Sequence, residues 1–269
     1  MHLHSLTSLF EDAKQRVQQQ PSDLSARSGL WQIFALQGQW DRAHKQLEVM
    51  LQLDASWAME VQACHGLLLA EEQRGRVFAG QEAPVCVGEP EPWFAQLAAG
   101  LKLLAQGQKA EAAALFFEAQ QAAPSRGGEW NGEAFDWLCD GDARLGPCLE
   151  IIVQGKYLWL PWHRLRTLTL RPPAEPRDML WQPALIELTD DGAIEAFIPM
   201  RYPAPRNDAE SLSRITNWEA LDEQLYIGHG QKAVITNQQE FGLLDLRKLH
   251  MAGAVTASED AVLAPGGHA

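Results

Sequence analysis

The chain has 269 residues, of which 46% are hydrophobic and 21% are charged, a composition ordinary for a globular protein with one large or two modest domains. Its formal net charge of −13 disfavours binding to nucleic acid and to acidic membrane surfaces, since like charges repel. No apolar run reaches the ~18–20 residues that cross a bilayer, and the opening MHLHSLTSLFED lacks the basic start of a signal peptide. We therefore expect a cytoplasmic protein without membrane insertion.

The first half of the chain repeats a helical pattern with a period of about 34 residues. Residues 24–55 and 93–124 each place apolar side chains at helical spacing on two segments, with Gly38 or Gly107 at the turn between them. Gly100 stands where the two helices of the later unit are expected to cross. The unit boundaries lie 34, 35 and 34 residues apart, at Pro21, Ala55, Pro90 and Pro124. This pattern is typical of a tetratricopeptide repeat.

The unit between these two repeats is degenerate, and a half-unit precedes them. The sequence predicts a helix over residues 57–73, but residues 75–90 contain too many Gly and Pro residues for a second long helix. Residues 5–20 are expected to form an amphipathic helix ahead of the first unit. We therefore predict that residues 1–125 form a tetratricopeptide-like α-helical solenoid, a fold that leaves a curved face for protein partners. The pattern does not single out the residues of that partner groove.

Beyond residue 124 the hydrophobic pattern alternates, which indicates β-strands. The clearest hairpin covers residues 184–200, in which Asp191 and Gly192 supply a strong signal for a tight turn. Further strands are predicted over residues 156–162, 164–170, 232–236 and 241–249. The alternation predicts a small antiparallel β-sheet or barrel.

The change of pattern also predicts how the chain divides. We expect a helical domain over residues 1–125, a mostly β domain over residues 126–250 and a disordered tail over residues 251–269, rich in small residues. Within the second domain, residues 203–225 are expected to be a polar connection with one helix over residues 211–225. The predicted fold class is therefore α+β, with the solenoid first and the β domain second.

An acidic motif, FDWLCDGDARLGPCLE, occupies residues 135–150 and raises the question of a metal or catalytic site. We tested it as a calcium-binding EF-hand loop that starts at Asp140. Leu145 then stands where position 6 requires Gly, and Ile151 stands where position 12 requires Glu. Asp140, Gly141 and Asp142 could form a DxD metal–nucleotide site, but no phosphate-binding glycine loop accompanies them.

A structural role explains more of the motif. Pro147 suits the first turn of a helix and Gly155 suits the position just beyond its end, so we predict a short helix over residues 147–154. The aspartates are then expected to cap a turn or to pair with Arg144. The residues that we single out as structural or family-motif candidates are Phe135, Asp136, Trp137, Asp140, Asp142, Arg144, Gly146 and Pro147.

No signature of an enzyme accompanies the motif, because GxSxG, HExxH and a catalytic Cys–His arrangement are all missing from the sequence. We therefore predict a non-enzymatic protein with no catalytic, cofactor-binding or metal-binding residues and no cofactor. Because the cysteines form no CxxC pair, we expect reduced thiols and no zinc site. The cysteines are Cys64, Cys86, Cys139 and Cys148. The alternative left open is a metal-dependent enzyme that uses Asp136, Asp140 and Asp142.

The motif and the strands after it, residues 135–170, resemble the signature of the ImpE/TagJ family, also called SciE-type proteins. Further matching segments are GQWDRAHKQLEVMLQLD, RGRVFAGQEAPVCVGEP, RDMLWQPA, IPMRYP and LLDLRKL, so the resemblance runs from about residue 5 to residue 250. It implies a cytoplasmic, non-enzymatic, virulence-associated accessory protein of the bacterial type VI secretion system. It also implies binding to the small subunit of the contractile sheath, through the N-terminal helix of that subunit, and a link to the AAA+ ATPase ClpV, which disassembles contracted sheath.

The implied role agrees with the predicted fold, since a helical solenoid can hold an amphipathic helix in a groove. The alternative among binding proteins is a general scaffold or chaperone that docks its partners through the β domain.

Overall fold

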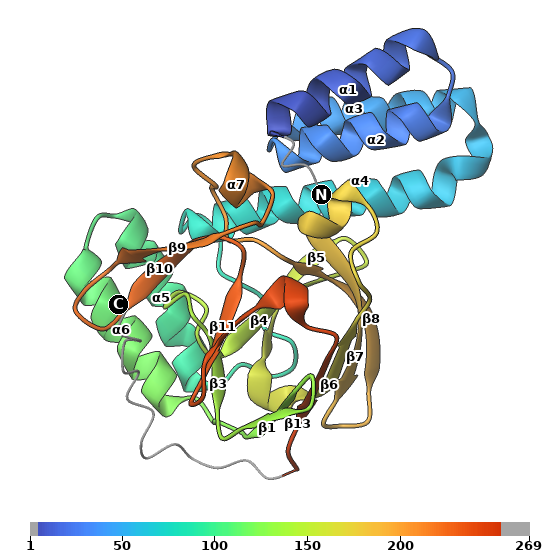
Figure 1. The fold of residues 1–269 in the computed structure, drawn as a ribbon. Coiled ribbons are helices and arrows are strands. Elements are labelled where there is room, and N and C mark those ends of the chain that lie inside the picture. Colours follow the sequence, from blue (N-terminus) through green and yellow to red (C-terminus); the bar gives the residue numbers. More distant parts are fainter. Residues whose placement is uncertain (1–4, 254–269) are drawn as a thin grey trace.

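The computed structural model describes residues 5–253 and shows an α+β protein, which confirms the predicted fold class (Figure 1). Helices fill the chain up to residue 122, and antiparallel strands dominate after it. The helices are α1 (Leu6–Gln19), α2 (Leu24–Leu36), α3 (Trp40–Leu53), α4 (Ala58–Phe78), α5 (Pro92–Ala105), α6 (Lys109–Ala122) and the short α7 (Asp208–Ser211). Single 3-10 turns are η1 (Ala55–Trp57), η2 (Trp162–Arg164), η3 (Pro176–Met179) and η4 (Leu243–Asp245).

Two helix pairs form tetratricopeptide-like units, as the repeat predicts. Helix α2 packs on α3, and α5 packs on α6. Gly38 and Gly107 lie in the connecting turns with φ of +69° and +80°, a backbone conformation that favours glycine. In Figure 1, α1 to α3 and the first part of α4 extend away from the strands, whereas α5 and α6 lie against them.

The middle unit lacks its second helix, as predicted, and the β-sheet occupies the space beside it. Helix α4 runs to Phe78, longer than the predicted helix, and a loop without helix follows up to residue 91. This loop pairs with a strand instead, because the Val87 N–H donates to the Trp159 carbonyl at 2.9 Å and the Trp159 N–H donates to the Val85 carbonyl at 2.8 Å. Backbone hydrogen bonds to the sheet edge therefore replace a helix-to-helix contact.

The crossing of α5 and α6 depends on Gly100. A Cβ atom added there would lie 2.4 Å from Cε1 of the buried Phe116 ring. We expect Gly100→Ala to lower the free energy of unfolding by about 1–3 kcal/mol through overpacking, although alanine favours a helix by ~1 kcal/mol. The control is Gly29→Ala in α2, where no neighbouring atom lies within 4 Å and a gain of up to ~1 kcal/mol is expected. Urea unfolding of both variants tests this; equal stabilisation of both would contradict the close crossing.

The strands form one large sheet and two small ones, and every strand pair in the described residues is antiparallel. The large sheet has the order β2-β1-β13-β6-β7-β8-β4-β5, and the small sheets have the orders β12-β11-β3 and β10-β9. The strands are β1 (Gly128–Trp130), β2 (Glu133–Phe135), β3 (Leu138–Asp140), β4 (Cys148–Val153), β5 (Lys156–Pro161), β6 (Leu165–Leu170), β7 (Trp181–Leu188), β8 (Ala193–Pro199), β9 (Thr216–Ala220), β10 (Tyr226–Gly230), β11 (Ala233–Thr236), β12 (Glu240–Gly242) and β13 (Lys248–Met251).

The predicted hairpin over residues 184–200 is confirmed. Strand β7 pairs with β8, and Ile186 lies opposite Ile194. Asp191 has a φ of +66° in the connecting turn, where Asp is among the residues that tolerate the left-handed region.

The predicted helix over residues 147–154 is wrong, because this segment is strand β4. It forms a hairpin with β5 whose two turn residues, Gln154 and Gly155, both have positive φ (+49° and +75°). That is the pattern of a tight two-residue hairpin turn, so Gly155 turns a strand and does not end a helix. Pro147 lies just before the strand, and its carbonyl accepts a hydrogen bond from the Trp162 N–H at 2.9 Å.

The predicted helix over residues 211–225 is also wrong. Helix α7 ends at Ser211, and Ser213 follows with a φ of +52°, which is incompatible with a continuing α-helix. Residues 216–220 then pair with residues 226–230 as the β9–β10 ribbon. Cross-strand pairing therefore overrides the helical propensity of this segment.

The last predicted strand pair is partly confirmed. Strand β11 pairs with β12, as expected, but η4 interrupts the predicted strand over residues 241–249. Its second part is β13, which leaves the pair and inserts between β1 and β6. The disordered tail was predicted to begin at residue 251, but Met251 belongs to strand β13, so that boundary is too early. Residues 254–269 of the predicted tail lie outside the described residues.

The helices and the sheets share one apolar core. A single buried cluster contains Leu97 of α5, Trp159 of β5 and Trp181 of β7, while a second cluster is built mainly by the strands. The last helix of the first part ends at Ala122 and the first strand begins at Gly128, on either side of the predicted boundary. The division into two domains stays a prediction, and the shared core ties the two parts together.

Candidate functional site

A buried network of charged side chains lies where α4 meets the sheet. Arg74 of α4 is 0% exposed and donates two hydrogen bonds to the Glu150 carboxylate of β4, from Nε to Oε1 at 2.6 Å and from Nη2 to Oε2 at 3.0 Å. Its Nη1 donates to Glu71 Oε1 at 2.8 Å, and Nη2 also donates to the Arg201 carbonyl at 2.7 Å. A bidentate arginine–carboxylate pair of this kind fixes both position and orientation.

The network continues from Glu150 into the small sheet. Lys232 lies just before β11, and its Nζ lies 2.5 Å from Glu150 Oε2 and 2.8 Å from Asp140 Oδ2. The Tyr202 hydroxyl donates to Asp140 Oδ1 at 2.7 Å. Helix α4, strand β4 and the β3–β11 pair are thus joined by one chain of charge-assisted hydrogen bonds, buried away from water.

The charges of the network balance, which allows them to be buried. It holds four carboxylates, Glu71, Asp140, Asp142 and Glu150, and four basic groups, Arg74, Arg144, Arg201 and Lys232. Arg201 forms no ion pair in the described residues and donates instead to the Leu36 and Ser211 carbonyls. Pairing of this kind offsets the large cost of removing each ion from water.

The two central carboxyl groups respond differently to burial. Burial alone would raise the pKa of Glu150, but Arg74 and Lys232 outweigh it and lower that pKa to about 2. For Asp140, burial raises the pKa more than the neighbouring Lys232 lowers it. Glu150 is therefore the firmly ionised centre of the network, held by two cations, which suits a structural link rather than a general base.

The acidic motif supplies one side of the network and also holds strand β10. The Asp142 carboxylate pairs with the Arg144 guanidinium, with Nη2 to Oδ2 at 2.5 Å, and accepts the Gly228 N–H at 2.9 Å. The Asp142 N–H donates to Asp140 Oδ1 at 2.9 Å, and the Ala143 N–H donates to the Tyr226 carbonyl at 2.8 Å. The motif therefore fixes the β9–β10 ribbon from its own loop.

The three aspartates of the motif are not brought together. Asp140 and Asp142 are buried, but Asp136 is exposed and exchanges hydrogen bonds with Asn237, at 2.8 Å and 2.7 Å. Among the described residues, no group of three or more His, Cys, Asp or Glu side chains could hold a metal ion. Asp142 is engaged by Arg144 and Asp140 by Lys232, so the basic groups occupy the positions where a cation would bind.

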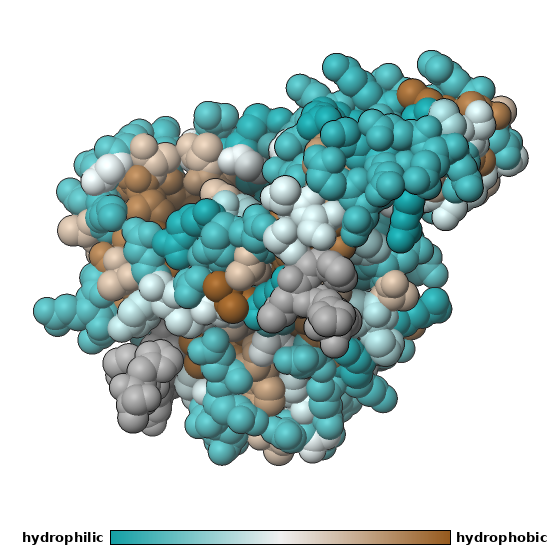
Figure 2. Space-filling model, turned by 45° about the horizontal axis from the view of Figure 1, so that its top comes forward, coloured by the Kyte–Doolittle hydropathy of each residue, from teal (hydrophilic) through white to brown (hydrophobic). Residues whose placement is uncertain are grey.

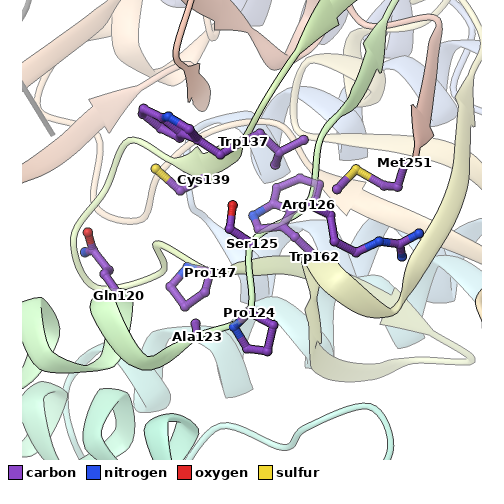
Figure 3. Close-up of a pocket in the computed structure, with 11 residues that line it drawn as sticks. Gln120, Ala123, Pro124, Ser125, Arg126, Trp137, Cys139, Pro147, Trp162 and Met251 are labelled. Carbon is purple, nitrogen blue, oxygen red and sulfur yellow. The ribbon is translucent and has the colours of Figure 1, made fainter. Parts of the chain in front are cut away.

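The other motif candidates have packing or turn roles, and two of them line a small pocket. Phe135 is buried at the end of β2, and the Gly146 carbonyl accepts the Asp140 N–H at 2.7 Å. Trp137 and Pro147 line a pocket of about 50 Å³ at the end of α6 (Figure 3). That volume is far below the ~300–1,000 Å³ of ligand-binding pockets.

The sequence analysis missed the most buried charged residues of the site. Arg74 and Glu150 lie 76 positions apart, and Glu150 and Lys232 lie 82 apart, so no local spacing links them. Only Glu150 could have been recognised from the sequence. It is a lone carboxylate within the apolar run CLEIIV, and such a buried charge requires a buried partner.

The fold and the site define a class of protein: a tetratricopeptide-like helical array joined to antiparallel sheets through a buried ionic network. Comparison with known proteins agrees. The family model described as "ImpE protein" matches residues 132–250. The "Type VI secretion system accessory component TagJ" of Pseudomonas aeruginosa is 41% identical over 247 residues, which are 91% of this chain and 86% of TagJ. The chain belongs to the ImpE/TagJ family.

A solved structure shows the same fold. The crystal structure of protein VPA1032 from Vibrio parahaemolyticus superposes with a TM-score of 0.85 at 24% identity and covers 92% of this chain and 94% of VPA1032. Within residues 5–253, none of the helices has the length and apolar character needed to cross a membrane.

Proposed function

We propose that the protein is a non-enzymatic, cytoplasmic accessory component of a bacterial type VI secretion system. It binds the small subunit of the contractile sheath, through the N-terminal helix of that subunit, and takes part in sheath assembly or in disassembly by ClpV. The observation that carries this proposal is the 41% identity to TagJ along 91% of the chain.

The structure supports a binding role in two ways. Tetratricopeptide-like units present helix faces to partners, and in Figure 1 α1 to α3 and the first part of α4 extend away from the strands. The family motif is occupied by internal ion pairs and turn hydrogen bonds, which leaves the metal-dependent enzyme without a cluster of three free carboxylates. We therefore expect that titration of the protein with Mg²⁺, Mn²⁺ or Ca²⁺ releases no heat of binding in a calorimeter.

Calorimetry with the full chain tests the proposed partner. We expect binding to the small sheath subunit from the same organism, and at least tenfold weaker binding when the N-terminal helix of that subunit is removed. Equal affinity for both forms would overturn the helix as the bound segment, and no binding to either would overturn the sheath subunit as the partner. The rate of sheath disassembly by ClpV, with and without the protein, tests the link to the ATPase.

The alternative is a general scaffold that docks its partners through the β part. It predicts that unrelated amphipathic helices, titrated in the same way, bind with an affinity similar to that of the sheath subunit. The full chain is required because the helices and strands share a core, so that a fragment of either part would expose buried apolar surface.

A further inference from the structure

A cavity of about 770 Å³ opens between the end of α6, the β9–β10 ribbon and the β11–β12 hairpin; we call it the α6–β9 groove. Its walls include Gln120 of α6, Trp218 of β9, Tyr226 of β10 and Ile235 of β11. Its volume falls within the ~300–1,000 Å³ range of ligand-binding pockets. Asp140 of the buried charge network also lines the cavity, so the groove and the network meet at the family motif.

The groove combines apolar walls with a rim of hydrogen-bonding groups. Trp218, Tyr226 and Ile235 are only partly buried, so their apolar surfaces face the cavity and solvent. Phe117 lies one turn before Gln120 on α6 and is 41% exposed, which extends this apolar surface along the helix. Figure 2 shows apolar residues gathered on the left of the molecule, the side on which α6 and the β9–β10 ribbon lie in Figure 1. Exposed apolar surface of this kind marks interaction sites.

The family motif builds the wall of this groove. A Cβ atom on Gly141 would lie 2.4 Å from Cη2 of Trp218, so the absence of a side chain allows the indole to lie directly on the motif loop. Two hydrogen bonds hold the opposite strand of the ribbon: the Ala143 N–H donates to the Tyr226 carbonyl, and the Gly228 N–H donates to the Asp142 carboxylate. The groove is therefore pre-formed, which lowers the entropic cost of binding.

The mouth of the groove is acidic. Asp222 and Glu223 are exposed in the turn that continues into the lining residues of β10, and Glu240 is exposed on the lining hairpin. Across residues 5–253, no ion pair joins any of these three carboxylates to a basic side chain. Two exposed basic side chains near β9 are engaged by another carboxylate, since Lys109 and Arg206 lie 3.9 Å and 3.7 Å from Glu219, while Lys232 and Arg144 pair within the buried network.

We propose that the α6–β9 groove binds a cationic amphipathic segment of a protein partner. Bulky apolar side chains of the segment rest on Trp218 and Ile235, while its Lys or Arg side chains face Glu223 and Glu240. Complementary charge of this kind sets the orientation of the segment and speeds its association. The proposed function enters this inference at one point: it identifies the small sheath subunit as the protein that supplies the segment.

The test uses two double variants of the full chain that change the net charge equally. Glu223→Lys with Glu240→Lys reverses the mouth of the groove. Asp12→Lys with Glu195→Lys reverses exposed carboxylates on α1 and β8 and is the control. Calorimetry measures binding of each to the sheath subunit and to a synthetic amphipathic peptide of Leu and Lys, which does not depend on the natural partner. Far-UV circular dichroism verifies that both variants are folded.

We expect both ligands to bind the groove variant at least tenfold more weakly than the wild type and the control variant within twofold of it. We also expect the peptide to slow hydrogen exchange in residues 215–228 and 233–240. Equal affinities of the two variants for the sheath subunit would overturn the groove while leaving the proposed function intact. If the peptide binds at the groove but the sheath subunit does not bind, the groove stands as a binding site and the proposed function is overturned. Equal affinities of the two variants for the peptide would overturn the inference. Purification of the protein with a small molecule bound in the groove would also overturn it.

Discussion

Replacing Arg74 with Met is expected to lower the free energy of unfolding by about 3–5 kcal/mol, the range for breaking a buried ion pair. The methionine keeps most of the length of the side chain but leaves Glu150 and Glu71 without their shared cation. Both carboxylates lie in the buried interface, at 0% and 8% exposure, where water cannot replace the lost partner. Urea unfolding at pH 7, followed by circular dichroism, measures the loss.

Arg76→Met is the matched control for this experiment. Arg76 lies two residues further along α4 and pairs with Glu82 at 2.5 Å, but the two side chains are 45% and 38% exposed. Solvent-exposed pairs contribute at most ~1 kcal/mol, so the control is expected to unfold nearly as the wild type does. Equal losses in the two variants would mean that burial adds nothing to the Arg74 pairs and would contradict the role of the network.

The helical half of the fold could be predicted because its signals are local. Gly38 and Gly107 mark turns that require positive φ, and Gly100 marks a crossing that leaves no room for a Cβ atom. The missing second helix of the middle unit was also visible, since Pro84 and Pro90 cannot continue a helix.

The strand half was predicted where a turn signal bounded two alternating runs and failed where pairing between distant segments decided the structure. The hairpin around Asp191 satisfied the first condition. Residues 148–153 did not, because a proline before an apolar run and a glycine after it fit both a short helix and a strand. The turn at Gln154 and Gly155 matters more than Pro147, since it brings β4 against β5 along six residue pairs.

The site could be predicted in part. The pairing of Asp142 with Arg144 follows from their closeness in sequence, and the structure shows it. The separation of Asp136 from the other aspartates depends on the pairing of β3 with β11, which places Asp140 opposite Val234 while Asp136, before the strand, meets Asn237. The involvement of Arg74 and Lys232 depends on tertiary contacts alone.

The motif therefore connects the charge network with the α6–β9 groove. Asp140 joins the network that ties α4 to the sheets, and it also lines the groove. Gly141 and Asp142 position the β9–β10 ribbon and with it the wall of the groove. A change at Asp142 should thus affect both stability and the binding that we propose for the groove.

Asp142→Asn is the substitution that separates this structural role from metal binding. Oδ2 of Asp142 accepts hydrogen bonds from the Gly228 N–H and from Arg144 Nη2, while Oδ1 accepts the Arg144 N–H at 2.9 Å. An amide NH₂ in the place of either oxygen would face a donor, and the Arg144 guanidinium, 11% exposed, would lose its counter-charge. We expect a loss of about 3–5 kcal/mol in the free energy of unfolding.

Asp136→Asn provides the control within the same motif. Asp136 is exposed and its side chain meets only the amide of Asn237 in the described contacts, so the expected change is within ~0.5 kcal/mol. Unfolding in urea measures both variants, and hydrogen exchange of residues 216–230 reports whether the ribbon loosens in Asp142→Asn alone. If the aspartates instead formed a metal site, added Mg²⁺ or Ca²⁺ would stabilise the wild type, and both variants would bind the metal more weakly and be stabilised less. A stability of Asp142→Asn equal to that of Asp136→Asn would refute the anchoring of the ribbon by the motif.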